Sequence, residues 1–104
     1  MAENLTLARP YAEAAFALAR DGQSLAAWAS ALDRLALVAA DPAVLECMAN
    51  PRLQSSQLVQ LITEAAGISL TPEQHSFVSL LIENDRAALL PEIRSLFFVR
   101  KNEV

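Results

Sequence analysis

An apolar surface too wide for a single core runs along residues 8–20, which read ARPYAEAAFALAR. On a helical wheel of about 100° per residue, these apolar positions cover roughly 200°, whereas a helix on one core needs a stripe only somewhat wider than about 100°. In order around the wheel, the arc contains Ala14, Leu7, Leu18, Tyr11, Ala15, Ala8, Ala19, Ala12 and Phe16. Such a helix is either buried at the centre of a bundle or has a second apolar edge that contacts something other than the core.

A second predicted helix, residues 72–84, has the same excess of apolar surface. Its apolar residues Phe77, Val78, Leu80, Leu81 and Ile82 also span roughly 200°, opposite a narrow polar strip. Two explanations remain open. Both helices are completely buried, or each has one edge in the core and another lining a groove for an added amphipathic helix. On the residues alone, complete burial is the simpler explanation, although the alanines favour close approach of a partner.

Helix-forming residues dominate the rest of the chain. The 104 residues are 54% apolar, with alanine and leucine foremost and only two glycines, a composition that favours helices and supports one hydrophobic core. We therefore predict an all-α protein, with one domain over residues 1–104 built as a compact six-helix bundle that is mostly antiparallel because its loops are short. The predicted helices are residues 6–20, 24–40, 42–49, 54–66, 72–84 and 91–102.

Capping residues set the predicted boundaries. Asp41 precedes Pro42, and Thr71 is followed three residues later by Gln74, so both Asp41 and Thr71 are expected as N-caps. Pro10 is expected in the first turn of the opening helix, where proline is tolerated. The remaining boundaries are taken from Gly22 and Gly67 at helix ends, Ser24 as a cap, a polar cap cluster at residues 55–57, and Pro91 at a helix start.

The charge balance argues against a nucleic-acid partner. The formal net charge is −4 and the pI is about 4.8, whereas binding to phosphates needs a basic stripe. We interpret the late cations Arg94, Arg100 and Lys101 as solvated charge. The most apolar window, LAAWASALDRLALVAA, is interrupted by Asp33 and Arg34, and the first residues show no signal-peptide pattern, so we expect a soluble chain without membrane insertion.

No pattern of residues marks a catalytic site. His75 is the single histidine and lies among polar neighbours, and the single cysteine, Cys47, sits at an apolar position as a small hydrophobe. One histidine and one distant cysteine cannot form a zinc-type ligand cluster. A glycine-rich phosphate loop and a nucleophile elbow are also missing from the sequence. We expect no enzyme activity, no cofactor and no metal.

Two segments together resemble a known family. ARPYAEAAFALA, residues 8–19, closely resembles the opening helix of the δ subunit of bacterial F-type ATP synthase, called OSCP in mitochondria. LLIENDRAALLPEI, residues 80–93, resembles a later pattern of the same family, in which EN is followed by one residue, an arginine, and then LP and an apolar position. Neither segment is decisive alone, but the pair is specific, and the resemblance extends over essentially the whole chain.

The resemblance implies a six-helix N-terminal domain with a stator role and no catalysis of its own. Such a domain binds the helical N-terminal segment of an ATP synthase α subunit and helps to hold the catalytic head still during proton-driven ATP synthesis. The family's C-terminal domain engages the peripheral stalk made by the b subunits. The chain ends about where that domain would begin, so we expect it to be absent. The implied location is peripheral, at the cytoplasmic face of the bacterial plasma membrane.

In the resembling family, the α segment lies in an apolar groove between the first and fifth helices, which here are the two helices with wide apolar arcs. On the first helix, we assign Ala12, Ala15, Phe16 and Ala19 to the core. To the groove we assign Leu7, Tyr11, Ala14 and Leu18 from the first helix, and Ser76, Phe77, Leu80 and Asn84 from the fifth. The stretch His75 to Val78 departs from the family's usual apolar pattern, which affects individual groove contacts.

Three further expectations accompany this assignment. An empty apolar groove favours weak self-association of the isolated domain. A small helical regulatory or DNA-binding adaptor is the alternative function, against which the acidic pI counts. An enzyme subunit whose site is completed by a partner is a third reading, and His75 is the only residue that would support it.

Overall fold

The computed structural model describes residues 2–103, and within them the side chains of residues 3–102. It confirms the predicted all-α class, because the described residues form six α-helices and one short 3-10 helix, with no strand. The elements are α1 Ala2–Asp21, α2 Leu25–Ala39, α3 Pro42–Met48, α4 Ser55–Ala66, α5 Pro72–Glu83, η1 Ala87–Leu89 and α6 Leu90–Glu103.

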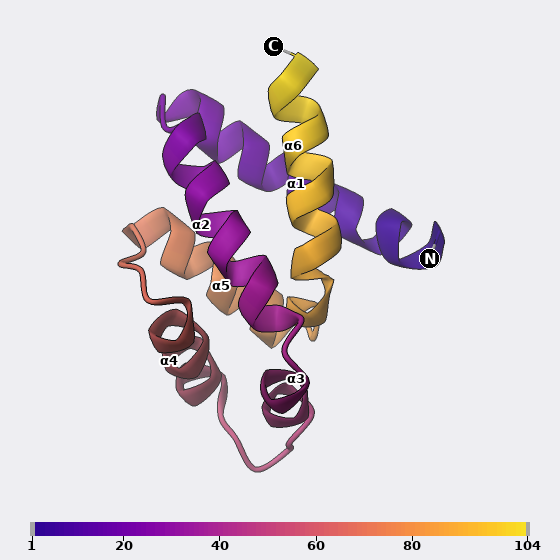
Figure 1. Ribbon diagram of the computed structural model, residues 1–104, viewed down its shortest axis with the longest axis vertical. Helices are drawn as coiled ribbons and strands as arrows, with labels where there is room; N and C mark the ends of the chain where they lie inside the picture. Colours follow the sequence, from indigo (N-terminus) through magenta and orange to yellow (C-terminus); the bar gives the residue numbers. More distant parts are fainter. Residues whose placement is uncertain (1, 104) are drawn as a thin grey trace.

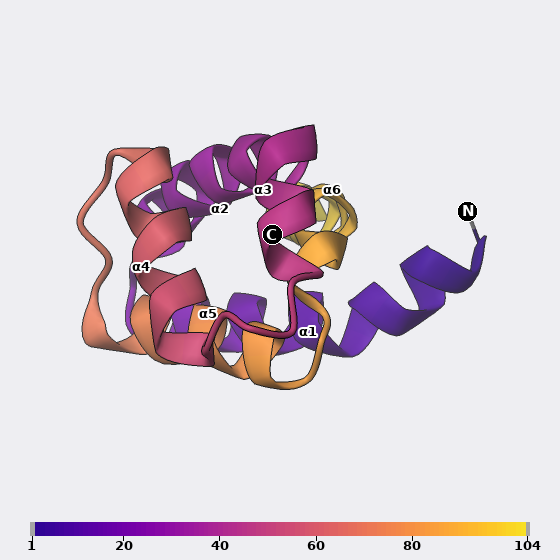
Figure 2. The ribbon, with the colours of Figure 1, turned by 90° about the horizontal axis from the view of Figure 1, so that it is seen from below.

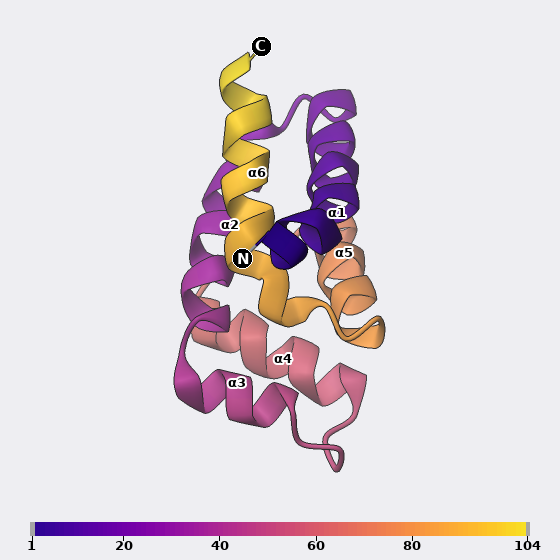
Figure 3. The same cartoon turned by 90° about the vertical axis from the view of Figure 1, so that its right-hand side faces the viewer.

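The helices are arranged in two layers (Figures 1 and 3). Helices α1 and α5 form one layer, and α2 and α6 form the other, while α3 and α4 close one end of the bundle. The C-terminal end of α6 points away from that closed end (Figure 1). The first turns of α1 project beyond the other helices, as seen from below in Figure 2.

Helix α6 organises the core because it packs against both α1 and α2. Phe97 and Ile93 of α6 are completely buried, and the Phe97 ring meets the Phe16 ring of α1 edge-on, with 6.1 Å between ring centroids. Trp28 and Leu32 of α2 are also buried. These contacts join both layers into one hydrophobic cluster.

The two strongest predicted N-caps are confirmed. The Asp41 carboxylate accepts a hydrogen bond from the Ala43 amide at 2.8 Å. Thr71 and Gln74 satisfy each other reciprocally: the Gln74 amide donates to the Thr71 hydroxyl at 3.2 Å, and the Thr71 amide donates to the Gln74 side chain at 3.0 Å. Gly67 ends α4 with a left-handed φ of 67°, which glycine adopts without steric cost.

The predicted start of α1 and the place of Pro10 were wrong. Helix α1 begins at Ala2 rather than at residue 6, so Pro10 lies inside the helix and not in its first turn. Because proline has no N–H to donate to the carbonyl four residues before it, one helical hydrogen bond is lost there. The strong helix formers on both sides of Pro10 keep the chain helical across it.

Two predicted caps are confirmed only in part. Ser24 is the N-cap residue of α2, as predicted, but its side chain forms no capping hydrogen bond, since its hydroxyl donates to the Ala19 carbonyl at 3.4 Å. The cap of α4 is Gln54 rather than a residue of the 55–57 cluster, and its amide donates to the Gln57 side-chain carbonyl at 2.8 Å. No serine side chain therefore forms a capping hydrogen bond at either place. The Ser24 hydroxyl bonds to a carbonyl instead, and the start of α4 is capped by Gln54 and Gln57.

Two of the three late cations, Arg94 and Arg100, are paired and not simply solvated, which corrects the sequence interpretation for these two residues. Arg94 forms an ion pair with Asp33 of α2 at 2.7 Å, and Arg100 forms one with Glu13 of α1 at 3.1 Å. The two guanidinium groups also lie over the Phe98 and Phe16 rings, at 4.2 and 4.5 Å from the ring centroids. Both ion pairs are well exposed, so each contributes modestly to stability. They connect α6 to α2 and to α1.

Replacing Phe97 with alanine should lower the free energy of unfolding by about 3–5 kcal/mol, because a completely buried ring is lost and leaves a cavity. The matched control on the same helix is Val99→Ala, since Val99 is 57% exposed and should change stability by less than about 0.5 kcal/mol. Urea denaturation followed by circular dichroism measures both. Equal effects of the two substitutions would contradict the described position of α6.

Candidate functional site

Helix α1 has one buried edge and one exposed edge. Ala12, Ala15 and Ala19 are completely buried and Phe16 is 2% exposed, which confirms their assignment to the core. On the other edge, Leu18 is 43% exposed. Complete burial of this helix, which the residues alone favoured, is therefore wrong.

Helix α5 is divided in the same way. Val78 and Leu81 are completely buried, whereas Leu80 is 44% exposed. Phe77 lies between these extremes in position: it is only 4% exposed, yet part of its ring reaches the surface between α1 and α5. The excess apolar surface on α5 is therefore also presented outward, so each of the two helices has one edge in the core and one exposed edge.

The outward edges of α1 and α5 face a common depression with a volume of about 360 Å³. It is lined by Ala14, Leu18, Pro72, Glu73, Ser76, Phe77 and Leu80. We call this depression the α1–α5 groove. Ala14 and Ser76 have small side chains, so a second backbone could approach closely at these two points. Leu18 and Leu80 provide apolar walls.

One end of the groove is bridged by a hydrogen bond. The Asn84 side-chain amide, just after α5, donates to the Tyr11 hydroxyl of α1 at 3.2 Å. Tyr11 is half-buried, with its ring against the core cluster and its hydroxyl at the rim, as the sequence interpretation expected. At the other end, Leu18 and Glu73 both line the groove, so α1 and α5 run in opposite directions along it.

The structure brings together seven of the eight residues assigned to the groove. Five line the depression directly, and Tyr11 and Asn84 bridge its end. Leu7 lies one turn before Tyr11 on the same helix edge and is 43% exposed, but it does not line the depression. It belongs to the part of α1 that runs toward the projecting N-terminal end (Figure 2).

Two lining residues, Pro72 and Glu73, were missed by the sequence analysis. Glu73 precedes Ser76 and Phe77 by three and four residues, so the helical spacing that selected Leu80 and Asn84 could have found it. Glu73 was passed over because a carboxylate is not apolar, and Pro72 was passed over because it was interpreted only as a helix-start residue. In the structure, Glu73 places a negative charge at the wall of an otherwise apolar groove.

The base of the groove connects to the core through aromatic contact. The Phe77 ring meets the buried Trp28 ring of α2 edge-on, with centroids 5.5 Å apart. Because Phe77 is held between groove and core, its position is set before any partner arrives. A ligand that touches Phe77 would also alter the surroundings of Trp28, the single tryptophan.

No three histidine, cysteine, aspartate or glutamate side chains within residues 3–102 lie close enough together to hold a metal ion. His75 is exposed and Cys47 is a half-buried free thiol. Within the described part of the chain, no helix is both long enough and apolar enough to span a bilayer.

The fold and this site define a small helical protein with a pre-formed apolar groove on one layer. Comparison with known proteins identifies its family: the family model described as "ATP synthase delta (OSCP) subunit" matches residues 7–104. The chain therefore belongs to the ATP synthase delta (OSCP) subunit family, as its resemblance to that family predicted.

Several curated relatives carry the name ATP synthase subunit delta. The protein of Aromatoleum aromaticum is 53% identical over 103 residues, covering 99% of this chain and 58% of the relative. The proteins of Bordetella petrii and Dechloromonas aromatica are 46% and 43% identical, covering 98% and 93% of this chain and 58% and 54% of the relatives. The chain thus spans somewhat over half the length of these relatives.

Replacing Tyr11 with phenylalanine keeps the ring but removes the hydroxyl that bridges the groove. We expect the free energy of unfolding to fall by no more than about 1 kcal/mol, because the bond is at the surface. Thermal unfolding of Tyr11→Phe, Asn84→Ala and the double variant forms a double-mutant cycle. Strictly additive effects would show that the bridge contributes nothing in solution.

Proposed function

We propose that this protein is a non-catalytic stator component of a bacterial ATP synthase, in which the α1–α5 groove binds the helical N-terminal segment of an α subunit. The bound segment links the catalytic head to the peripheral stalk and resists the torque of the rotor during proton-driven ATP synthesis. Family membership supports the complex, and the exposed apolar edges of α1 and α5 support the surface. The single observation that carries the proposal is the open groove between Leu18 and Leu80.

The chemistry of the groove fits an amphipathic helix. Its walls offer exposed leucines whose burial would stabilise a complex, and Ala14 and Ser76 allow close approach of a second backbone. A groove already formed by the fold loses little entropy on binding, whereas the segment must become ordered. Affinity should therefore depend on a few apolar anchors near Leu80 and Phe77.

The greater length of the relatives supports a further proposal about the assembly. We propose that a further C-terminal domain, corresponding to the part of those relatives that this chain does not cover, engages the b-subunit stalk. The working location is then the cytoplasmic face of the plasma membrane, as a peripheral part of the complex. The acidic net charge of −4 remains an argument against the alternative of a DNA-binding adaptor.

A titration with a peptide of the α subunit's N-terminal segment from the same organism tests the proposal. Amide NMR shifts should saturate and cluster on α1 and α5, and Trp28 fluorescence should change in parallel because Phe77 touches Trp28. The titration is run at concentrations where sedimentation shows a monomer, because an empty apolar groove favours self-association. A folded chain that shows no saturable shifts would overturn the proposal.

The substitution Leu80→Asp should weaken binding of this peptide at least about tenfold, because a carboxylate would be buried against the apolar face of the segment. Its matched control is Leu45→Asp on α3, where Leu45 is 38% exposed compared with 44% for Leu80. Isothermal titration calorimetry measures both affinities, and circular dichroism verifies the fold. Unchanged affinity in a folded Leu80→Asp variant would exclude this groove as the binding surface.

A further inference from the structure

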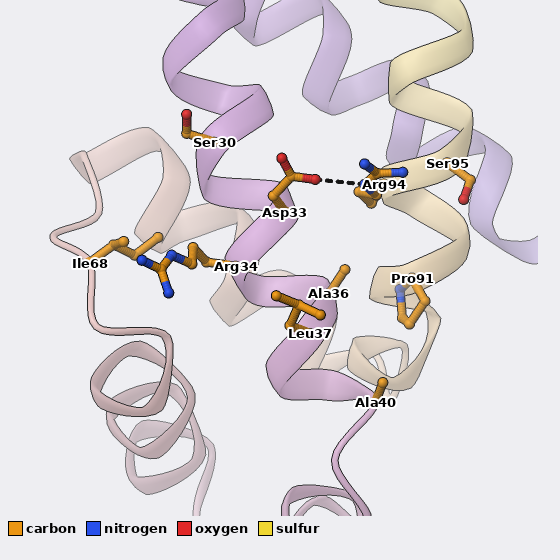
Figure 4. Close-up of a pocket in the computed structure, with 10 residues that line it drawn as sticks. All are labelled: Ser30, Asp33, Arg34, Ala36, Leu37, Ala40, Ile68, Pro91, Arg94 and Ser95. Carbon is orange, nitrogen blue, oxygen red and sulfur yellow. Dashed lines mark hydrogen bonds and ion pairs between the residues drawn. The ribbon is translucent and has the colours of Figure 1, made fainter.

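A second and larger depression, with a volume of about 690 Å³, lies on the opposite layer along the outward side of α2. It is bounded by α6 on one side and by Ile68, in the loop after α4, on the other (Figure 4). Figure 4 shows its lining residues, which we call the α2–α6 groove. They are Ser30, Asp33, Arg34, Ala36, Leu37, Ala40, Pro91, Arg94 and Ser95, together with Ile68 from the loop after α4. The proposed function of the α1–α5 groove makes no use of this surface.

The α2 side of this groove is a continuous helix face. Ser30, Asp33, Leu37 and Ala40 recur at three- and four-residue spacing, so they follow one side of the helix over about 15 Å. Leu37 is 71% exposed, an unusually open position for a leucine. The face combines this apolar side chain with small neighbours that let a backbone approach, and its length suits a short helical segment.

The charges in the α2–α6 groove have the opposite sign to the chain as a whole. Two guanidinium groups, Arg34 and Arg94, and one carboxylate, Asp33, give the lining a net charge of +1, whereas the chain carries −4. Arg94 forms an ion pair with Asp33 at 2.7 Å (Figure 4). Its guanidinium group also lies 4.2 Å from the centroid of the Phe98 ring. Arg34 is exposed and has no ion-pair partner among the side chains of residues 3–102.

We propose that the α2–α6 groove is a second docking surface, which takes a short amphipathic helical segment carrying carboxylates beside its apolar side chains. Leu37 and Ile68 contact the apolar side of that segment, and Arg34 pairs with one of its carboxylates. The Asp33–Arg94 pair and the ring beneath Arg94 hold the far wall in place. The helices that line the two grooves belong to different layers, α1 and α5 in one and α2 and α6 in the other (Figure 3). We therefore expect the two surfaces to bind independently.

The unpaired Arg34 is the reason to choose an acidic segment. A basic segment would face Arg34 without compensation, and a purely apolar one would leave the guanidinium at the edge of a desolvated contact. An acidic segment is repelled by the chain's overall charge of −4, so binding at this place would depend on the local charge. This inference is independent of the proposed function, because it involves other residues and another partner chemistry.

The test uses a designed helical peptide of about 16 residues, built from leucine, alanine and glutamate, and a twin in which every glutamate is lysine. Amide NMR with the whole 104-residue chain should show saturable shifts on the α2 and α6 lining for the glutamate peptide, and these should weaken with added salt. The lysine twin should bind this surface at least about tenfold more weakly.

Variants locate the contact. Arg34→Glu should weaken binding of the glutamate peptide about fivefold or more, and Leu37→Asp about tenfold or more. Arg52→Glu, in the loop before α4, and Leu45→Asp are the matched controls and should leave affinity unchanged, since neither residue lines the α2–α6 groove. All four positions are exposed, so each variant should fold.

Four results would overturn the inference: no saturable shifts with the glutamate peptide, shifts confined to α1 and α5, equal binding of the lysine twin on the α2–α6 lining, or shifts that arise only from self-association of the chain. Because the α-subunit peptide is titrated separately and read on α1 and α5, failure of either proposal can be told apart from failure of the other. Leu80→Asp should leave binding of the glutamate peptide unchanged.

Discussion

The packing of α6 between α1 and α2 is the constraint on which the rest of the structure depends. Phe97 and Ile93 are completely buried there, and Phe97 meets Phe16 at the centre of the core. Because α6 covers the alanine-rich edge of α1, the leucine edge of α1 has to face outward. The exposed apolar edge that lines the α1–α5 groove is thus a consequence of how the core is filled.

The core and the α1–α5 groove share one side chain. Phe77 belongs to both, since it lines the α1–α5 groove and packs edge-on against the buried Trp28. A side chain packed on two sides keeps its position before binding, so little entropy is lost at Phe77 when a partner binds. The bridge between Asn84 and Tyr11 adds a polar limit at one end, where α1 and α5 are far apart in sequence but adjacent in space.

The two grooves differ in charge, although the chain as a whole carries a net charge of −4. Arg94 and Arg100 of α6 are paired at the surface with Asp33 of α2 and Glu13 of α1, so they join α6 to its neighbours instead of forming a basic patch. Arg34 alone of the groove arginines is left without such a pair within the described side chains. The two layers therefore present different surfaces: an apolar groove with one acidic residue at α1–α5, and a groove of net positive charge at α2–α6.

The sequence by itself determined the helical class and the caps at Asp41 and Thr71, because these depend on residue spacing and on local hydrogen bonds. The assignment of α1 residues to a core edge and a groove edge came from the family resemblance. Even the excess of apolar surface on α1 and α5 was visible in the pattern. Only the tertiary structure decided that this excess is exposed, that Pro10 lies within a helix, and that Arg94 and Arg100 are paired. Burial and ion pairing depend on residues distant in the chain, and a helical wheel cannot tell which neighbour will cover an apolar edge.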